Sequence, residues 1–190
     1  MAETILYQVD DNCSKDEFPD MVQEAQASLI GFKHLYQRWL SPVYRYFYSR
    51  VGISKDAEDL TAQVFLKVYE YLPHYRECGQ FPAWLFTIVR NQAMDYFKSR
   101  SREVSLEIID PVDETRDLLS EAVLSEEIRR LHHLIYELPE EEQELIRLRF
   151  VVKLGYREIG VVLNRKEDAV RKAVTRLLAR MENQMEINHE

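Results

Sequence analysis

Residues 156–180, YREIGVVLNRKEDAVRKAVTRLLAR, decide the fold that the sequence predicts for the C-terminal half of the chain. Their pattern predicts a short helix over 156–163, a turn at Asn164, and a second helix over 167–180. Asparagine suits the turn because it adopts the left-handed backbone conformation more readily than most residues. Gly160 leaves room for the two helices to cross closely. The stretch therefore predicts a helix-turn-helix.

The second helix of this motif has an apolar side and a basic side. The basic side fits a recognition helix in the major groove of DNA. The alternative is an ordinary amphipathic helix, in which acids pair with bases four residues later, as Glu167 with Arg171. We favour DNA binding because the short helix, the tight turn and the basic helix occur together. The apolar positions, which recur at helical spacing, are Val170, Ala173, Val174, Leu177 and Met181.

The charge of the chain is distributed in blocks. The net charge is −8, yet residues 147–180 carry ten basic and three acidic side chains. Residues 1–30 and 103–127 are acidic, with seven acids against one base and nine acids against one base. A local excess of positive charge attracts phosphates whatever the overall sign. The acidic total therefore does not exclude a nucleic-acid ligand.

Composition favours an all-helical protein. The 190 residues include only 5 Gly and 6 Pro, and 46% are hydrophobic. A chain of this length can bury one ordinary core or two small ones. We expect all-α architecture with two small helical domains joined by an acidic linker, the second domain containing the helix-turn-helix. The expected divisions are an acidic tail at 1–20, a first domain at 21–100, the linker at 101–121, and a second domain at 122–185.

Five further helices are expected outside the motif, and they span 28–50, 54–72, 82–100, 120–137 and 140–152.

The linker is rich in acidic residues. Its acids keep it solvated or serve an inhibitory role, and the sequence leaves both readings open.

The helix over 54–72 has one leucine in an otherwise polar face. Ser54 is its expected N-cap, and its apolar stripe is expected to face a core. Leu66 lies almost opposite this stripe, among acids and amides. A lone exposed leucine is common, and a partner-binding side chain is the alternative. The positions of the stripe are Ala57, Leu60, Val64, Val68 and Tyr71.

An aromatic loop and a polar helix face follow. Residues 73–81 carry Tyr75, Arg76 and Phe81, and aromatic rings beside arginine can stack on unpaired bases. The next helix has a buried side and a polar side, which faces either a nucleic-acid backbone or only solvent. The polar side comprises Arg90, Asn91, Met94 and Lys98.

Neither catalysis nor a metal site is indicated. Cys13 and Cys78 lack metal-ligand spacing, no Gly-rich phosphate loop occurs, and no catalytic residue, cofactor or metal is predicted. No run approaches the roughly 18 apolar residues of a membrane span, so we expect a soluble, cytoplasmic protein without a membrane span. The histidines are scattered, at His34, His74, His132, His133 and His189.

Two separate stretches resemble one family, the extracytoplasmic-function (ECF) group of bacterial sigma factors. DAEDLTAQVFLKVYEYL (56–72) with FPAWLFTIVRNQAMDYFKSR (81–100) resembles sigma region 2. LPEEEQELIRLRFVVKLGYREIGVVLNRKEDAVRKAVTRLLARM (138–181) resembles sigma region 4. Their order, their separation and the acidic segment between them also fit that group.

The resemblance implies a specificity subunit that binds core RNA polymerase and reads promoter DNA, held at times by an anti-sigma factor. Polymerase binding is then expected at Asp59, Gln63 and Leu66. Minus-ten DNA is expected to contact Tyr75, Arg76, Phe81, Arg90, Asn91 and Lys98. Minus-thirty-five DNA is expected to contact Arg165, Lys166, Arg171, Lys172, Thr175 and Arg176.

Two rival functions remain to be compared with this one. A helix-turn-helix transcriptional regulator that does not dock on polymerase would leave residues 54–100 unexplained. A helical interaction adaptor would use its acidic segments to hold partners and would show no dependence on DNA. We favour the sigma factor because it accounts for both halves of the chain.

Overall fold

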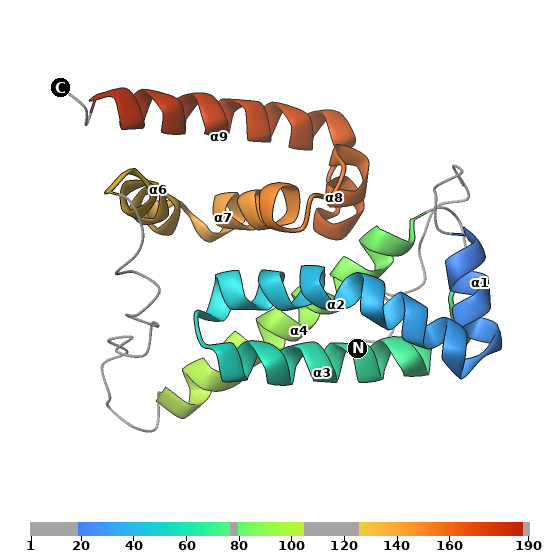
Figure 1. Ribbon diagram of the computed structural model, residues 1–190. Coiled ribbons are helices and arrows are strands. Elements are labelled where there is room, and N and C mark those ends of the chain that lie inside the picture. Colours follow the sequence, from blue (N-terminus) through green and yellow to red (C-terminus); the bar gives the residue numbers. More distant parts are fainter. Residues whose placement is uncertain (1–18, 77–79, 105–125, 188–190) are drawn as a thin grey trace.

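A computed structural model describes residues 19–76, 80–104 and 126–187, and within these ranges the regular structure is helical throughout (Figure 1). The all-helical class expected from composition is therefore confirmed. In chain order the elements are α1 (Pro19–Ala27), α2 (Leu29–Val51), α3 (Ser54–Tyr71), the 3₁₀ turn η2 (Leu72–His74), α4 (Phe81–Val104), α6 (Glu126–Glu137), α7 (Glu140–Ile146), the π-helical turn η3 (Arg147–Val151), α8 (Tyr156–Leu163) and α9 (Glu167–Ile187).

Helix α2 begins and ends at residues with clear capping roles. The hydroxyl of Ser28 accepts a hydrogen bond of 3.0 Å from the Gly31 amide, which satisfies a donor at the helix start. A Cβ at Gly31 would overlap the backbone of Glu24, so glycine lets α1 and α2 pack closely. Gly52 ends the helix in the left-handed conformation, with φ 73°. Pro42 lies inside α2, which continues through it.

Helix α3 confirms most of the predicted stripe and corrects two details. The stripe residues from Ala57 to Val68 are buried, whereas Tyr71 is exposed. The N-cap is Ile53, and Ser54 is the first helical residue. The Ser54 hydroxyl lies 3.1 Å from the Tyr44 hydroxyl and 3.1 Å from a Glu58 carboxylate oxygen. The predicted cap was wrong because this side chain is engaged by neighbouring side chains.

The helix predicted over 140–152 changes character halfway. It starts after Pro139 as an α-helix and becomes π-helical at Arg147. The Val152 amide donates to the Arg147 carbonyl across 3.0 Å, which closes the wider turn. Lys153, with φ 69°, then ends the segment.

The predicted helix-turn-helix is present. Asn164 takes the left-handed conformation with φ 52°, as its position in the turn predicted. The Arg165 amide donates to the Gly160 carbonyl across 2.7 Å, and a Cβ at Gly160 would lie 2.6 Å from the Arg165 carbonyl oxygen. Glycine is therefore required for this close approach. Helix α9 runs beyond the predicted end, to Ile187.

The helices lie in two layers that touch each other. Helices α2, α3 and α4 form one layer, and α6, α7, α8 and α9 form the other (Figure 1). Helix α4 packs against α8, and α2 packs against η3. In the described part of the chain, no helix is long and apolar enough to cross a membrane.

The structure describes only some of the residues that form the predicted tail and linker. The expected linker over 101–121 overlaps the last residues of α4, which extends to Val104. The remainder of that linker, and residues 1–18 of the expected acidic tail, lie outside the described residues. Pro19 and Asp20 belong to α1. The exact bounds of the two domains stay a prediction.

Candidate functional surfaces

The six candidates for upstream DNA lie together on the surface of the helix-turn-helix. All six are exposed, at the turn after α8 and along the first half of α9. The opposite side of α9 is buried, as its spacing predicted, with Ala173 only partly covered. The exposed candidates are Arg165, Lys166, Arg171, Lys172, Thr175 and Arg176.

Arg171 is held in place by two neighbours. It pairs with Glu167 across 2.6 Å, the contact that an ordinary amphipathic helix also predicts. Its guanidinium lies over the Tyr156 ring, 5.2 Å from the centroid, and that of Arg149 lies 4.7 Å from the same centroid. Tyr156 therefore orients two cations beside the turn. Sequence reasoning assigned this tyrosine no role, because its contact with Arg171 joins two different helices.

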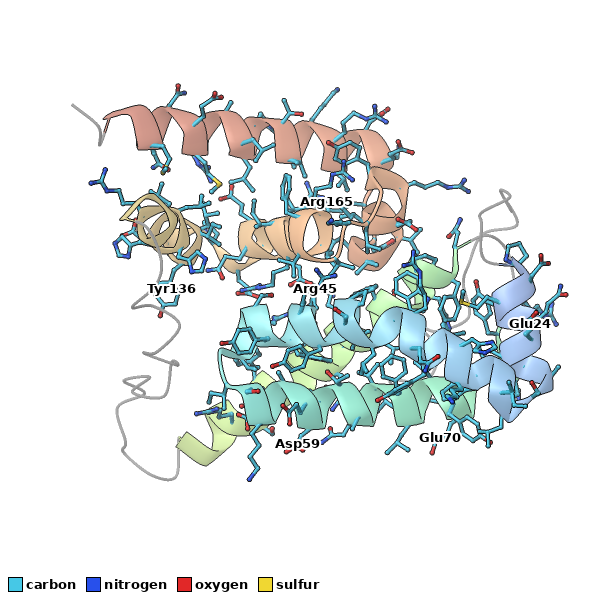
Figure 2. The ribbon with its side chains drawn as sticks, in the orientation of Figure 1. Glu24, Arg45, Asp59, Glu70, Tyr136 and Arg165 are labelled. Atoms are coloured by element: carbon cyan, nitrogen blue, oxygen red, sulfur yellow. The ribbon has the colours of Figure 1, made fainter. Side chains whose placement is uncertain are left out.

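The polymerase-binding candidates lie on an exposed side of α3. Leu66 is 66% exposed, so the leucine that the helical spacing placed opposite the core does point to solvent. Asp59 and Gln63 are exposed on the same helix. Figure 2 shows Asp59 and Glu70 on the side of α3 that faces away from the second layer. The face is therefore open to a partner while the two layers touch.

Helix α4 supports this face through a pair of amides. The Gln92 amide nitrogen donates to the Gln63 side-chain oxygen across 2.6 Å, and Lys67 donates to the Gln92 side-chain oxygen across 2.6 Å. Asp59, Gln63, Gln92 and Asp95 are among the residues that line a shallow groove between α3 and α4. The docking candidates thus belong to a surface made by two helices.

Both of the predicted base-stacking rings are buried. Tyr75 and Phe81 are 8% and 1% exposed. Their ring centroids lie 5.6 Å apart, and each ring also packs against Trp84. Gln26 donates to the Tyr75 carbonyl across 2.7 Å and so holds the start of the loop. Stacking on a base would require these rings to leave the core, whereas Arg76 is already exposed.

The α4 candidates divide between solvent and the second layer. Asn91 and Lys98 are exposed. The side chain of Arg90 is one-third exposed, and its Nε lies 3.8 Å from a carboxylate oxygen of Glu144 on α7. The structure therefore brings one minus-ten candidate into contact with the helix-turn-helix half.

Glu144 is the centre of a buried polar cluster between the layers. The Tyr46 hydroxyl donates to its carboxylate across 2.7 Å, and Arg50 donates to it across 3.2 Å. Arg50 also pairs with Glu140 across 2.8 Å, and Arg147 contacts both acids at 3.0 and 3.4 Å. Sequence reasoning missed this cluster, because an acid at an internal helical position carries no signal for a partner 98 positions away.

Burial and the Glu144 carboxylate raise the pKa of Tyr46 well above its ordinary value. For Arg50, burial acts to lower the pKa, but the neighbouring Tyr46, Glu144 and Glu140 outweigh it, and that pKa is raised. The cluster therefore holds a neutral tyrosine, which can donate, beside a charged arginine.

No metal centre occurs in the part of the chain that the structure describes. No three histidine, cysteine, aspartate or glutamate side chains gather there in a way that could hold an ion. The chemistry that these surfaces can perform is recognition by charge, hydrogen bonding and apolar contact.

Two family models match the chain, one in each half. Sigma-70 region 2 matches residues 35–103, and sigma-70 region 4 matches residues 128–181. The first match contains the exposed side of α3, and the second contains the helix-turn-helix. Together the two matches cover more than half of the chain.

Curated relatives carry the same description. The chain is 34% identical over 177 residues to the ECF RNA polymerase sigma factor BldN of Streptomyces coelicolor, covering 85% of this chain and 64% of the relative. It is 28% identical over 152 residues to SigM of Bacillus subtilis, covering 77% and 90%. It is 28% identical over 149 residues to the sigma-E factor of Escherichia coli, covering 73% and 78%. The chain spans just under two thirds of the length of BldN.

Two solved structures share the fold at 20% identity. CnrH in complex with the cytosolic domain of CnrY has a TM-score of 0.67, covering 88% of this chain and 96% of that one. The sigma factor RpoE of Bartonella quintana, in complex with the anti-sigma factor NepR, has a TM-score of 0.63, covering 82% and 97%. The sequence matches, together with a fold that covers both halves, establish the family. The chain belongs to the sigma-70 family, in the ECF group of RNA polymerase sigma factors.

Proposed function

We propose that this chain binds core RNA polymerase and directs it to a defined set of promoters. The observation that carries the proposal is the exposed basic side of the helix-turn-helix, on a chain that belongs to the ECF sigma factors. Polar residues of α9 face solvent while its apolar residues are buried where it packs against α6, α7 and α8. A helix held in this way can enter a major groove without unfolding.

Region 2 supplies the contact with polymerase in this proposal. Leu66 offers apolar surface, and Asp59 and Gln63 offer a charge and an amide beside it. An apolar side chain with a polar rim is the usual arrangement of a protein interface. Leu66 is therefore the residue that we expect to contribute most to binding.

The promoter is read in two ways. Upstream duplex DNA is read by α9, whose Arg and Lys side chains can contact phosphates and guanine edges. The minus-ten element is read after the strands separate, because unpaired bases expose edges and ring faces that a closed duplex hides. Arg76, Asn91 and Lys98 are exposed for this purpose.

A reconstitution experiment tests the proposal. The purified chain is mixed with bacterial core polymerase, holoenzyme is isolated by size-exclusion chromatography, and run-off transcripts are measured from promoters mapped after overexpression. We expect holoenzyme and transcripts that require the added chain. Absence of holoenzyme would overturn the proposal, and so would holoenzyme that starts transcription equally at all DNA ends. With the expected outcome, the protein acts in the cytoplasm as a specificity subunit, and polymerase performs the chemistry.

We also propose that an anti-sigma factor binds this chain. RpoE of Bartonella quintana was solved in complex with the anti-sigma factor NepR, and its chain shares the fold described above. A partner of this kind should reduce holoenzyme formation in the reconstitution assay. Cosynthesis of the chain with its encoded neighbours, followed by copurification, tests this part separately.

A further inference from the structure

Gln26, near the end of α1, is hydrogen-bonded to the segment that follows α3. Its amide nitrogen donates to the Leu72 carbonyl across 2.8 Å and to the Tyr75 carbonyl across 2.7 Å. A glutamine amide carries two donor hydrogens, so these two oxygens use both. The partners lie 46 and 49 positions away in the sequence. Gln26 therefore fixes two backbone carbonyls of residues 72–76, which we call the loop start.

Helix α1 is itself anchored to the first layer. Val22 and Ala25 are buried, and Gly31 lets α1 cross α2 at a distance that a Cβ would not allow. The Ser28 amide donates to the Glu24 carbonyl across 3.0 Å, so the two helices are joined through one residue whose backbone is fixed. Helix α1 packs against α2 and also contacts η2 (Figure 1). An anchored helix can restrain the loop start because it does not move with it.

Tyr75 is held at its side chain and at its backbone. Its ring is buried against Phe81 and Trp84, and its carbonyl accepts from Gln26. Its backbone is extended, with φ −67° and ψ 130°, so the chain leaves the turn here. The next residue is Arg76, which is exposed. The two restraints on Tyr75 therefore set the point from which the Arg76 side chain extends.

We propose that Gln26 is a positioning residue for minus-ten recognition, which holds the loop start so that Arg76 meets the unpaired strand already in place. Ordering a segment on binding costs conformational entropy, and a segment ordered beforehand avoids that cost. Gln26 acts through the backbone of Tyr75 and does not itself touch DNA. Helix α1 precedes residues 35–103, so this role belongs to a segment outside the match to sigma-70 region 2. The inference rests on the proposed function, because that function assigns Arg76 to DNA.

Amide hydrogen exchange, followed by mass spectrometry, tests whether Gln26 holds the loop start in the free chain. Gln26→Met removes both donor hydrogens and keeps an unbranched side chain of similar length. The backbone amides of residues 72–76 should then exchange about fivefold faster, as expected when two hydrogen bonds that water can partly replace are lost. Far-UV circular dichroism checks that the variant keeps its helices.

The matched control is Gln23→Met. Gln23 is exposed and lies on α1, three positions before Gln26. The control makes the same chemical change on the same helix and leaves the two bonds of Gln26 in place. Its loop start should exchange at the rate of the unmodified chain.

Binding of single-stranded DNA gives the second readout. The probe is a labelled non-template strand that carries the minus-ten element of a promoter mapped after overexpression, and it is titrated with holoenzyme. This strand needs no melting, so its affinity reports recognition alone. Gln26→Met should weaken its binding about threefold to fivefold, the factor by which the loop start becomes less ordered. Holoenzyme formation and binding of the upstream duplex should stay unchanged.

A double-mutant cycle with Arg76→Ala separates positioning from general stabilisation of the fold. If Gln26 acts through Arg76, then Gln26→Met should cost little further affinity once Arg76 is replaced. A residue that only stabilised region 2 would lower single-strand binding by the same factor in both backgrounds. The cycle therefore measures the coupling that the inference requires.

The outcomes separate this inference from the proposed function. Unchanged exchange at the loop start would overturn the role of Gln26 even if holoenzyme forms normally, and so would equal losses of affinity with and without Arg76. An equal response to Gln23→Met would overturn it as well. Faster exchange, with a loss of affinity that depends on Arg76, supports it. A chain that forms no holoenzyme would overturn the proposed function and, with it, the assignment of Arg76 to DNA, whatever the exchange rates show.

Discussion

The guanidinium of Arg171 lies over the ring of Tyr156, 5.2 Å from its centroid, and joins the start of α8 to the exposed side of α9. Glu167 holds the same guanidinium from one turn earlier on α9. An arginine restrained in this way loses less side-chain entropy when it binds DNA than a free one would. We therefore expect Tyr156 to position Arg171 on the proposed recognition helix.

Tyr156→Leu should weaken upstream promoter binding about twofold to fivefold, as expected for the loss of an exposed cation–π contact. Tyr156→Phe keeps the ring and should bind nearly as the unmodified chain does. Fluorescence anisotropy with the upstream promoter duplex measures both. An equal loss for the two variants would show that the hydroxyl, and not the ring, is what matters.

Replacing Arg171 and Arg176 by Ala should weaken upstream promoter binding while sparing holoenzyme formation. Each arginine that contacts a base edge contributes about 1–3 kcal/mol, so the pair should cost at least about tenfold in affinity. Arg180→Ala is the control, because Arg180 pairs with Glu142 and lies outside the candidate set. Equal loss of promoter binding and of holoenzyme would contradict the division of labour between the two regions.

Leu66→Glu should weaken the binding of core polymerase by about tenfold or more, because it removes apolar contact and places a charge in the interface. Leu178→Glu is a matched control, since Leu178 is also an exposed leucine but lies on α9. Size-exclusion chromatography and labelled-chain titration measure holoenzyme formation. Comparable weakening by both substitutions would remove the assignment of α3 as the docking face.

Tyr46 makes the free energy of unfolding of the chain depend on pH under alkaline conditions. Its pKa in the folded chain is raised above the ordinary value of about 10, so the proton is held more tightly in the folded state. Its stabilising contribution is complete below about pH 10 and is lost as pH rises above that value. Urea unfolding of the unmodified chain and of Tyr46→Phe, from pH 8 to 11, measures the difference. That difference should shrink above pH 10; a constant difference would contradict the raised pKa.

Gly160→Ala should destabilise region 4 by about 1–3 kcal/mol, because the added Cβ would lie 2.6 Å from the Arg165 carbonyl oxygen. Gly155→Ala is the paired control, since its Cβ would meet only a Glu158 carboxylate oxygen at 3.3 Å. Urea unfolding of both variants tests the expectation. Equal stability of the two would show that the helix crossing relaxes around the new methyl group.

The features that the sequence predicted well depend on neighbours along the chain. Asn164 marked the turn because its left-handed preference is local, and the spacing of Val170, Val174 and Leu177 marked the buried side of α9. The exposed position of Leu66 followed from helical geometry in the same way. Helical periodicity acts over a few residues, so one sequence suffices to read it.

The features that were missed depend on contacts between distant segments. Tyr75 and Phe81 carry the composition of a base-stacking loop, but packing against Trp84 buries them. Tyr71 fits the stripe of α3 by spacing, yet it is exposed, whereas the next residue, Leu72, is buried.

The sequence by itself determined most of the helices, the turn of the DNA-binding motif and the family, whereas α1 (Pro19–Ala27) was not expected. Only the tertiary structure decided that Glu144 meets Tyr46 and Arg50, 98 and 94 positions away. The physical reason is that a buried carboxylate needs partners wherever the fold supplies them, and no local pattern records which distant side chains those are.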